Sequence, residues 1–340
     1  MKQSILAILS ALVTSMKDTS RKYHPLILPL IQSSVEPVSE TRAYLLEDAV
    51  DLWHAILIQT PEPTQEILVL AQYLIPMFDT ATDTLRKALE ITESYFLLAP
   101  QAILQDCTSF LSVFANLLGG QLKREANGVI THLVEILVRA ADSLGGSIAV
   151  EALTKNLVET QFLSKLLTGL KVAYDAHQTT GPSRVYSDVD GIVETDYFSV
   201  LARIALASPS AFIAAIDAAS PSTERLEATM RWLFTEWFSH FENVGTADKK
   251  KLMCLALTSF LKLGTEMWSM GYLQDMMTMW TDVITECIEN PEDGGEGKDT
   301  LIYWDMESLK GGGIEAPEDG RRRNVSRTIK PNDGSVLMKV

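Results

Sequence analysis

The sequence lacks the residues and motifs on which most enzymes, metalloproteins and membrane proteins depend. Its 340 residues include only three cysteines and five histidines, and none of these stand at the spacing of a metal-ligand set. It contains no GxGxxG sequence, phosphate-binding loop or GxSxG sequence. No apolar run approaches the ~20 residues that span a bilayer. We therefore expect no active site, cofactor or metal ion, and no membrane as a partner.

The few cysteines and histidines have simpler explanations. Cys107, Cys254 and Cys287 are widely spaced in apolar stretches, so we expect buried thiols in a reducing compartment. We expect His54 on the surface of a helix and His177 in a loop.

Basic residues are also scarce relative to acidic ones. The chain has 29 lysines and arginines against 44 aspartates and glutamates, a formal net charge of -15. Such a surface repels nucleic acid and anionic membranes. It suits a basic partner, although plain solubility explains the charge equally well.

The N-terminal sequence MKQSILAILSALVTSMK combines a lysine with an apolar run, as a signal peptide does. The run fits one face of a helix, however, and no small-residue cleavage site follows it. We expect an internal helix of a truncated chain.

Strand signals are nearly absent, and helical periodicity extends to about residue 289. In the segment 226–241, apolar residues recur every three or four positions, and the opposite side carries the charged residues Glu224, Arg225, Glu227, Arg231 and Glu236. Thr246 is a candidate cap for the next helix, and Gly264 is a candidate C-terminal stop. This segment therefore predicts two antiparallel helices with facing apolar sides.

The same design recurs along the chain at a spacing of about 40 residues. The predicted pairs are 23–36 with 42–59, 63–78 with 82–98, 101–118 with 125–143, 148–175 with 194–207, 209–219 with 223–241, and 247–263 with 267–289. Three helices are predicted to begin at a proline, namely Pro61, Pro209 and Pro221. About six helix pairs predict an all-α fold, a superhelical α-solenoid of HEAT repeats. The stricter 34-residue period of a tetratricopeptide array is not found.

One helix pair cannot bury a wide apolar face alone, so stacked repeats must share their aromatic side chains. We expect Trp232, Trp237, Phe238 and Phe241 in the core.

Two segments break the helical pattern. Residues 175–196 contain glycine, proline and five acidic residues, and predict a long acidic loop. Residues 290–340 form a second unit that we expect to be mostly irregular, following a solenoid over 1–289. Within this tail, 301–309 is apolar enough to dock on the solenoid, and Arg321–Arg323 is a candidate kinase site or localisation signal.

Three stretches resemble one family in order and spacing. EWFSHFENVGTADKKKLMCLALTSFL (236–261) resembles a passage near the C-terminal end of karyopherin-β nuclear transport receptors. LLEDAVDLWHAILIQTP (45–61) and ESYFLLAP (93–100) are similar to segments of the importin-eleven branch of that family. The matching residues are Glu47, Asp48, Leu52, Trp53, Pro61, Trp237, Glu242, Asn243, Lys250, Lys251, Leu252, Leu255, Ala256 and Leu257.

The resemblance implies a C-terminal portion of a receptor that shuttles between cytoplasm and nucleus. It implies three kinds of partner: basic protein cargo such as ribosomal proteins, the FG repeats of nucleoporins, and Ran-GTP, which releases cargo. The main Ran site would lie outside this chain. FG phenylalanines would enter shallow apolar grooves between adjacent helices. A HEAT scaffold of a stable complex and a karyopherin exporter are the alternatives.

Four acidic residues are candidate cargo contacts. On the helix 82–98, Arg86, Glu90 and Glu93 share the face opposite Leu85, Leu89 and Phe96. We expect Glu90 and Glu93 to face cargo if this is an inner helix. In the acidic loop, Asp188 and Asp190 are the further candidates.

Overall fold

The computed structural model describes residues 2–78, 82–118, 124–179, 185–187, 189–220, 225–263, 271–289 and 315–327. Within these ranges every regular element is a helix. The all-α prediction is confirmed. The chain divides into two compact units, the first formed by Met1–Val113 with Trp304–Val325 and the second by Phe114–Tyr303 with Ser326–Val340.

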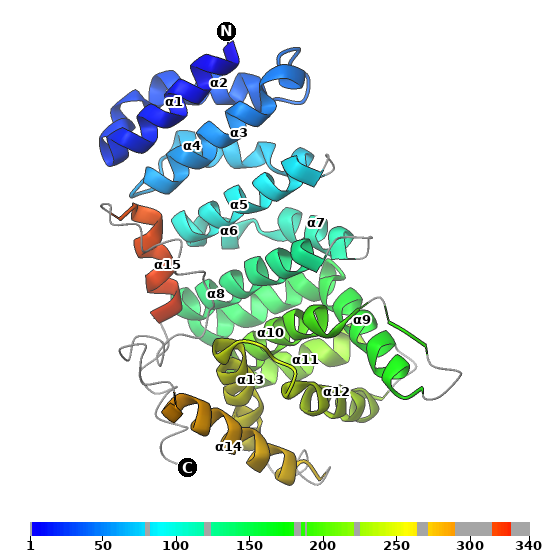
Figure 1. Ribbon diagram of the computed structural model, residues 1–340. Helices are drawn as coiled ribbons and strands as arrows, with labels where there is room; N and C mark the ends of the chain where they lie inside the picture. Colours follow the sequence, from blue (N-terminus) through cyan, green and yellow to red (C-terminus); the bar gives the residue numbers. More distant parts are fainter. Residues whose placement is uncertain are drawn as a thin grey trace. The chain divides into compact units, whose positions relative to one another are not determined.

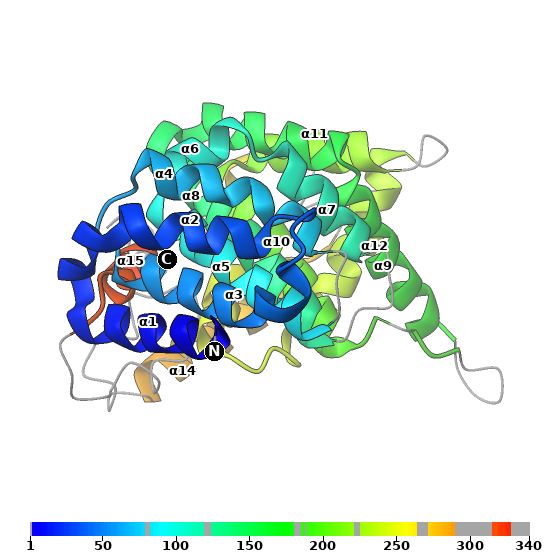
Figure 2. The same cartoon turned by 90° about the horizontal axis from the view of Figure 1, so that it is seen from above.

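Unit 1 is built from short helices in two rows. Its α-helices are α1 (Lys2–Met16), α2 (His24–Val35), α3 (Arg42–Gln59), α4 (Gln65–Leu70), α5 (Thr82–Leu98) and α6 (Pro100–Gln105), with the 3-10 helices η1 (Lys17–Tyr23), η2 (Ala71–Tyr73) and η3 (Ile75–Met77). Helix α1 packs on α3 and α3 on α5. Figure 2 shows α2, α4 and α6 on the side of this unit opposite α1 and α3. The boundary between the units falls inside α7 (Thr108–Leu118).

The core of unit 1 centres on a buried aromatic pair. Trp53 of α3 and Tyr95 of α5 are both 0% exposed and meet edge to face, with ring centroids 6.0 Å apart. The indole N–H of Trp53 donates to the Tyr95 hydroxyl (3.0 Å), which donates in turn to the Ile67 carbonyl of α4 (2.7 Å). Both polar atoms are therefore satisfied inside the core, and one hydrogen-bond chain joins three helices.

Unit 2 repeats the two-row design. Its α-helices are α8 (Arg124–Glu159), α9 (Phe162–His177), α10 (Gly191–Ala207), α11 (Pro209–Ala219), α12 (Leu226–Phe241), α13 (Ala247–Ser259) and α14 (Leu273–Glu289), with the 3-10 helix η5 (Phe260–Leu263). Helices α8, α10, α13 and α14 contact one another in succession, and α9, α11 and α12 lie against one another (Figure 1).

Aromatic rings fill the space between these helices. Trp237 of α12 is 0% exposed and stacks on Phe198 of α10 at 5.2 Å between centroids. Trp232 and Phe241 are also buried, which confirms them as core residues. Phe238 is only half-buried and stacks on Tyr272.

Glu236 contradicts the predicted charged face of α12. Its side chain is 3% exposed, whereas the periodicity places it in solvent. The helix packs against α9 and α10 as well as α11, so a wider arc of its surface is covered than one apolar stripe indicates.

Helix starts follow the predictions only in part. Pro209 opens α11 beneath a Ser208 cap, whose hydroxyl accepts from the Ala211 N–H. Pro61 lies in a bend, because α4 begins only at Gln65 after Thr64. Thr246 precedes α13, but its side chain makes no capping bond. Pro221 and Gly264 lie outside the described residues.

The predicted helix 148–175 is wrong, since two helices cover it. The first is the end of α8, which is broken at Gly146 (φ 58°, ψ -150°), a conformation that only glycine adopts readily. The second is α9, which follows Gln161 in a left-handed conformation (φ 63°).

The acidic loop is shorter than the predicted 175–196. Helix α9 continues to His177, and α10 begins at Gly191. Glu194 and Asp196, expected in the loop, are therefore buried residues of α10. His177 is the last residue of a helix rather than a loop residue.

In the tail, where mostly irregular chain is expected, the described residues 315–327 include the helix α15 (Pro317–Arg327). The apolar piece 301–309 lies outside the described residues. The N-terminal run forms α1, with Leu6 and Val13 buried, as expected of a helix. Among the described residues, no helix is long and apolar enough to cross a bilayer.

Cys107 and Cys254 are buried thiols, in agreement with the sequence. Cys287 lies among the residues whose side chains are not described.

We predict that Tyr95→Phe destabilises unit 1 by about 1–3 kcal/mol, because it strips partners from the buried Trp53 N–H and Ile67 carbonyl. Chemical denaturation measures the change. The control Tyr44→Phe removes a hydroxyl from a side chain that is 74% exposed, so the free energy of unfolding should stay unchanged. Equal stability of both variants would contradict the role of the hydroxyl.

Candidate functional site

The acidic residues of α5 form the first part of the candidate site. Leu85, Leu89 and Phe96 are buried, as the periodicity predicts. The Glu90 side chain, 32% exposed, pairs with Arg86 and Lys87, each at 3.2 Å. Glu90 is thus accessible but already neutralised by cations of its own helix.

Glu93 faces a different partner, the basic helix α15. Its carboxylate lies 2.7 Å from the guanidinium of Arg322 and is 14% exposed. Glu318, one turn before Arg322 on α15, lies 2.8 Å from the same guanidinium and is 1% exposed. One arginine therefore holds two nearly buried carboxylates, one from each helix.

Arg321 fastens α15 to the end of α3. Its guanidinium donates to the carbonyls of Thr60 (2.6 Å) and Leu57 (3.1 Å). The last carbonyls of a helix have no partner within it and carry partial negative charge, so an arginine is favourable there. Figure 1 shows α15 crossing the helices of unit 1. Arg323 pairs with Glu315, so all three arginines of the cluster predicted as a kinase site or localisation signal make intramolecular contacts.

Burial controls the ionisation of this site. Desolvation outweighs the attraction of Arg322 and raises the pKa of Glu93 to about 7. Burial likewise lowers the pKa of His54, whose side chain is 18% exposed and lies 4.0 Å from Glu90. His54 is therefore not the exposed helix-surface residue that the sequence predicts.

Asp188 and Asp190 are the two loop candidates. Asp188 lies outside the described residues. Asp190 caps α10, accepting the N–H groups of Ile192 (3.1 Å) and Val193 (3.3 Å) on one carboxylate oxygen. Its place at a helix start is structural, and its role in cargo binding stays a prediction.

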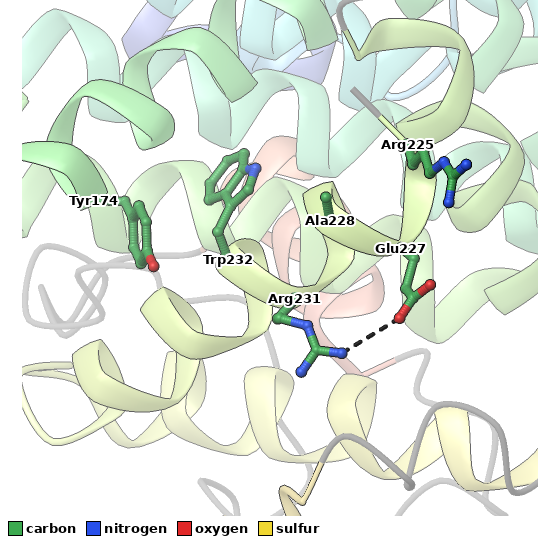
Figure 3. Close-up of a pocket in the computed structure, with 6 residues that line it drawn as sticks. All are labelled: Tyr174, Arg225, Glu227, Ala228, Arg231 and Trp232. Carbon is green, nitrogen blue, oxygen red and sulfur yellow. Dashed lines mark hydrogen bonds and ion pairs between the residues drawn. The ribbon is translucent and has the colours of Figure 1, made fainter. Parts of the chain in front are cut away.

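A pocket of about 430 Å³ opens between α9 and α12 (Figure 3). Tyr174 of α9 and Trp232 of α12 line one side, with ring centroids 5.8 Å apart. Arg225, Glu227, Ala228 and Arg231 complete the lining, and Arg231 bonds to Glu227 at 3.3 Å. The pocket has aromatic side chains on one side and both acidic and basic side chains at its edge. The helical periodicity of the sequence does not predict this pocket.

Stacked helix pairs in two rows, with aromatic side chains between them, define an α-solenoid of HEAT type. A solved chain with this fold is described as "Structure of Lph2, a novel bidirectional nuclear transport receptor in S. cerevisiae". Its TM-score is 0.74 at 17% identity, and the match covers 99% of this chain and 35% of that one.

The chain belongs to the importin-11-like family, because the family model described as "Importin-11-like, TPR repeats" matches residues 3–329. This confirms the resemblance to the importin-eleven branch. Tetratricopeptide repeats are helix pairs of about 34 residues. Here α2, α4 and α6 begin at residues 24, 65 and 100, so the spacing is uneven.

Two curated relatives carry transport-receptor names. Importin-11 of Homo sapiens is 23% identical over 333 residues, which are 95% of this chain and 31% of that protein. Importin beta-like protein kap113 of Schizosaccharomyces pombe (strain 972) is 22% identical over 303 residues, which are 89% of this chain and 28% of that protein. The chain spans under a third of the length of these relatives.

We predict that Glu93 makes unit 1 less stable as the pH rises. Its pKa of about 7 in the folded protein exceeds the reference value of 4.5. The folded state therefore favours the protonated form. That stabilisation is complete below pH 4.5 and is lost as the pH rises through about 7.

Glu93→Gln should remove this loss, so the variant gains stability relative to the natural chain between pH 5 and pH 8. Denaturant unfolding at both pH values measures the gain. Glu62→Gln, which removes an exposed carboxyl from the same unit, is the control. A stability difference between Glu93→Gln and the natural chain that stays constant with pH would contradict the assignment.

Proposed function

We propose that this chain is part of a nuclear transport receptor that carries basic protein cargo between cytoplasm and nucleus. The family and the transport-receptor names of its relatives support this role. In the whole receptor, Ran-GTP releases the cargo, and its main binding site lies outside this chain. A net charge of -15 favours a basic cargo such as a ribosomal protein.

The contact between Glu93 and Arg322 carries the proposal of a cargo site. A basic helix of this chain already lies on the acidic face of α5, with Arg322 at 2.7 Å from Glu93 and Arg321 on the end of α3. The surface therefore has the charge and the carbonyl acceptors that an arginine-rich segment needs. A cargo arginine reaches Glu93 when it displaces Arg322, and reaches the more open Glu90 in competition with Arg86 and Lys87 of the same helix.

The test is charge reversal of both glutamates in this chain. We predict that Glu90→Lys with Glu93→Lys weakens binding of a fluorescent arginine-rich peptide about 10-fold or more, because two favourable charge contacts become repulsive. Fluorescence anisotropy measures affinity, and circular dichroism confirms folding. Glu47→Lys with Glu62→Lys makes the same charge change elsewhere in unit 1 and is the control.

Arg322→Gln gives the opposite test, because it frees Glu93 without changing the acidic face. It should raise peptide affinity at low salt. Unchanged affinity in the folded Glu90→Lys, Glu93→Lys variant would remove both residues from the cargo site.

The pocket between α9 and α12 is our candidate for FG repeats. Tyr174 and Trp232 present an aromatic wall between two neighbouring helices (Figure 3), and a phenylalanine side chain gains by packing against such rings. Shallow apolar contacts of this kind are weak singly and rapid to form, as passage through a pore requires.

We predict that an FG-repeat column retains this chain and that Tyr174→Ser reduces its retention. Tyr44→Ser, at a tyrosine that is 74% exposed, is the control and should elute with the natural chain. A scaffold subunit of a stable complex would pass through the column unretained.

Export is the second candidate within the same class. The solved relative is described as bidirectional, so a member of this fold can serve both directions. An importer releases its cargo when Ran-GTP binds, whereas an exporter binds its cargo more tightly.

A further inference from the structure

Four ionisable side chains converge in unit 2, about one helical turn from the Tyr174 and Trp232 rings of the pocket between α9 and α12. His177 ends α9, Glu194 lies in the first turn of α10, and Glu236 and His240 lie one turn apart on α12. Ligand atoms of His177, Glu194 and Glu236 all lie within 4.8 Å of one another. The group, here called the His/Glu cluster, thus joins three helices.

The two carboxylates of the His/Glu cluster are nearly removed from solvent. The Glu194 side chain is 1% exposed and that of Glu236 is 3% exposed, whereas His177 is 49% exposed and forms the open side. His177 lies 2.6 Å from Glu236 through Nδ1 and 3.8 Å from Glu194 through Nε2. Within the described chain, the ion pairs of both glutamates are with histidines, with no lysine or arginine among them.

Glu194 is the member of the His/Glu cluster whose carboxylate lacks hydrogen-bond donors in the described chain. Both its carboxylate oxygens are buried and accept no hydrogen bond from a protein N–H or hydroxyl group in the described chain. Two adjacent carboxylates are costly to bury without a cation, and a bound cation would offset their charge.

His240 directs the lone pair of one ring nitrogen toward Glu194. Its Nε2 lies 2.9 Å from the Gly191 carbonyl and 2.9 Å from the Thr195 hydroxyl. A carbonyl only accepts, so Nε2 carries the proton, and in the neutral ring Nδ1 faces Glu194 at 3.4 Å with its lone pair. Metal-binding histidines are held in this way, with the far nitrogen donating to a backbone carbonyl.

We infer that the His/Glu cluster is a binding site for a divalent transition-metal cation, with Zn²⁺ the best fit. The imidazole of His177 and the carboxylates of Glu194 and Glu236 supply three ligands of the types that zinc takes, a number that leaves room for a water molecule as the fourth. Mg²⁺ and Ca²⁺ prefer oxygen ligands alone. His240 lies beside this group, 3.4 Å from Glu194. The short contact between His177 and Glu236 opens as the cation enters.

A bound cation would fix the ends of α9 and α10 to α12. His177 and Glu194 flank the loop between α9 and α10, so the metal closes that loop at its base. The inferred role is structural, because the three ligands come from three different helices and a cation would hold those helices together.

The experiment measures Zn²⁺ binding to this chain. The chain is first treated with a chelator, and the chelator is then removed. Isothermal titration calorimetry should show one equivalent bound, and the thermal unfolding temperature should rise with Zn²⁺. Co²⁺ provides a spectroscopic probe, with the strong visible absorption of a tetrahedral site. Millimolar Mg²⁺ should not displace either metal.

Two variants keep the inference falsifiable. Glu194→Gln and His177→Ala should each weaken Zn²⁺ affinity at least 10-fold, and His177→Ala, at a half-exposed helix end, tests the site without disturbing the core. Glu151→Gln removes an exposed carboxyl from α8 of the same unit and should bind Zn²⁺ like the natural chain. Absence of stoichiometric binding, or equal affinity of His177→Ala and Glu151→Gln, would overturn the inference.

Discussion

The structure depends on one constraint, which is that each helix pair has more apolar surface than it can bury alone. Trp53 is covered only because α5 packs on α3, and Trp237 only because α10 and α11 close over α12. Burial of a large aromatic side chain stabilises the fold by a few kcal/mol, so each helix pair gains its stability from its neighbours. This explains why an aromatic-rich, unreactive sequence folds as an array.

Stacking also forces charged residues into dry surroundings, and the chain handles them in different ways. Glu135 of α8 meets Arg203 of α10 at 3.4 Å, with both side chains nearly buried. Glu93 takes its arginine from a helix far along the sequence. Among the described residues Glu194 has no arginine or lysine in an ion pair, and its ion pairs are with His177 and His240. A buried charge without an opposite charge is costly, so these three glutamates are among the places where the fold is specified by more than apolar packing.

Periodicity and composition predict the all-α class and most of the helical segments, since these follow from spacing within a dozen residues, although 63–78, 101–118 and 148–175 are each divided into shorter helices. They fail where the outcome depends on distant partners. Glu236 reads as a solvated residue because its partner His177 is 59 positions away. Glu93 reads as open because Arg322 is 229 positions away. Gln161 adopts a left-handed backbone conformation, and no glycine stands at this position to indicate it. Glu90 and Glu93 therefore lie on the helix that the periodicity predicts, but the contact of Arg322 with Glu93 depends on a distant segment that the periodicity does not indicate.

The docking of α15 has a consequence for how the polypeptide is made. The hydrogen bonds of Arg321 to Thr60 and Leu57 span 261 and 264 residues, so they are among the most non-local contacts of the chain. Domains fold as they emerge from the ribosome, at about 5–20 residues per second. The amino-terminal helices therefore wait tens of seconds with the last carbonyls of α3 and the Glu93 carboxylate uncovered. During synthesis the nascent chain thus presents an anionic surface that its own carboxy-terminal segment later covers.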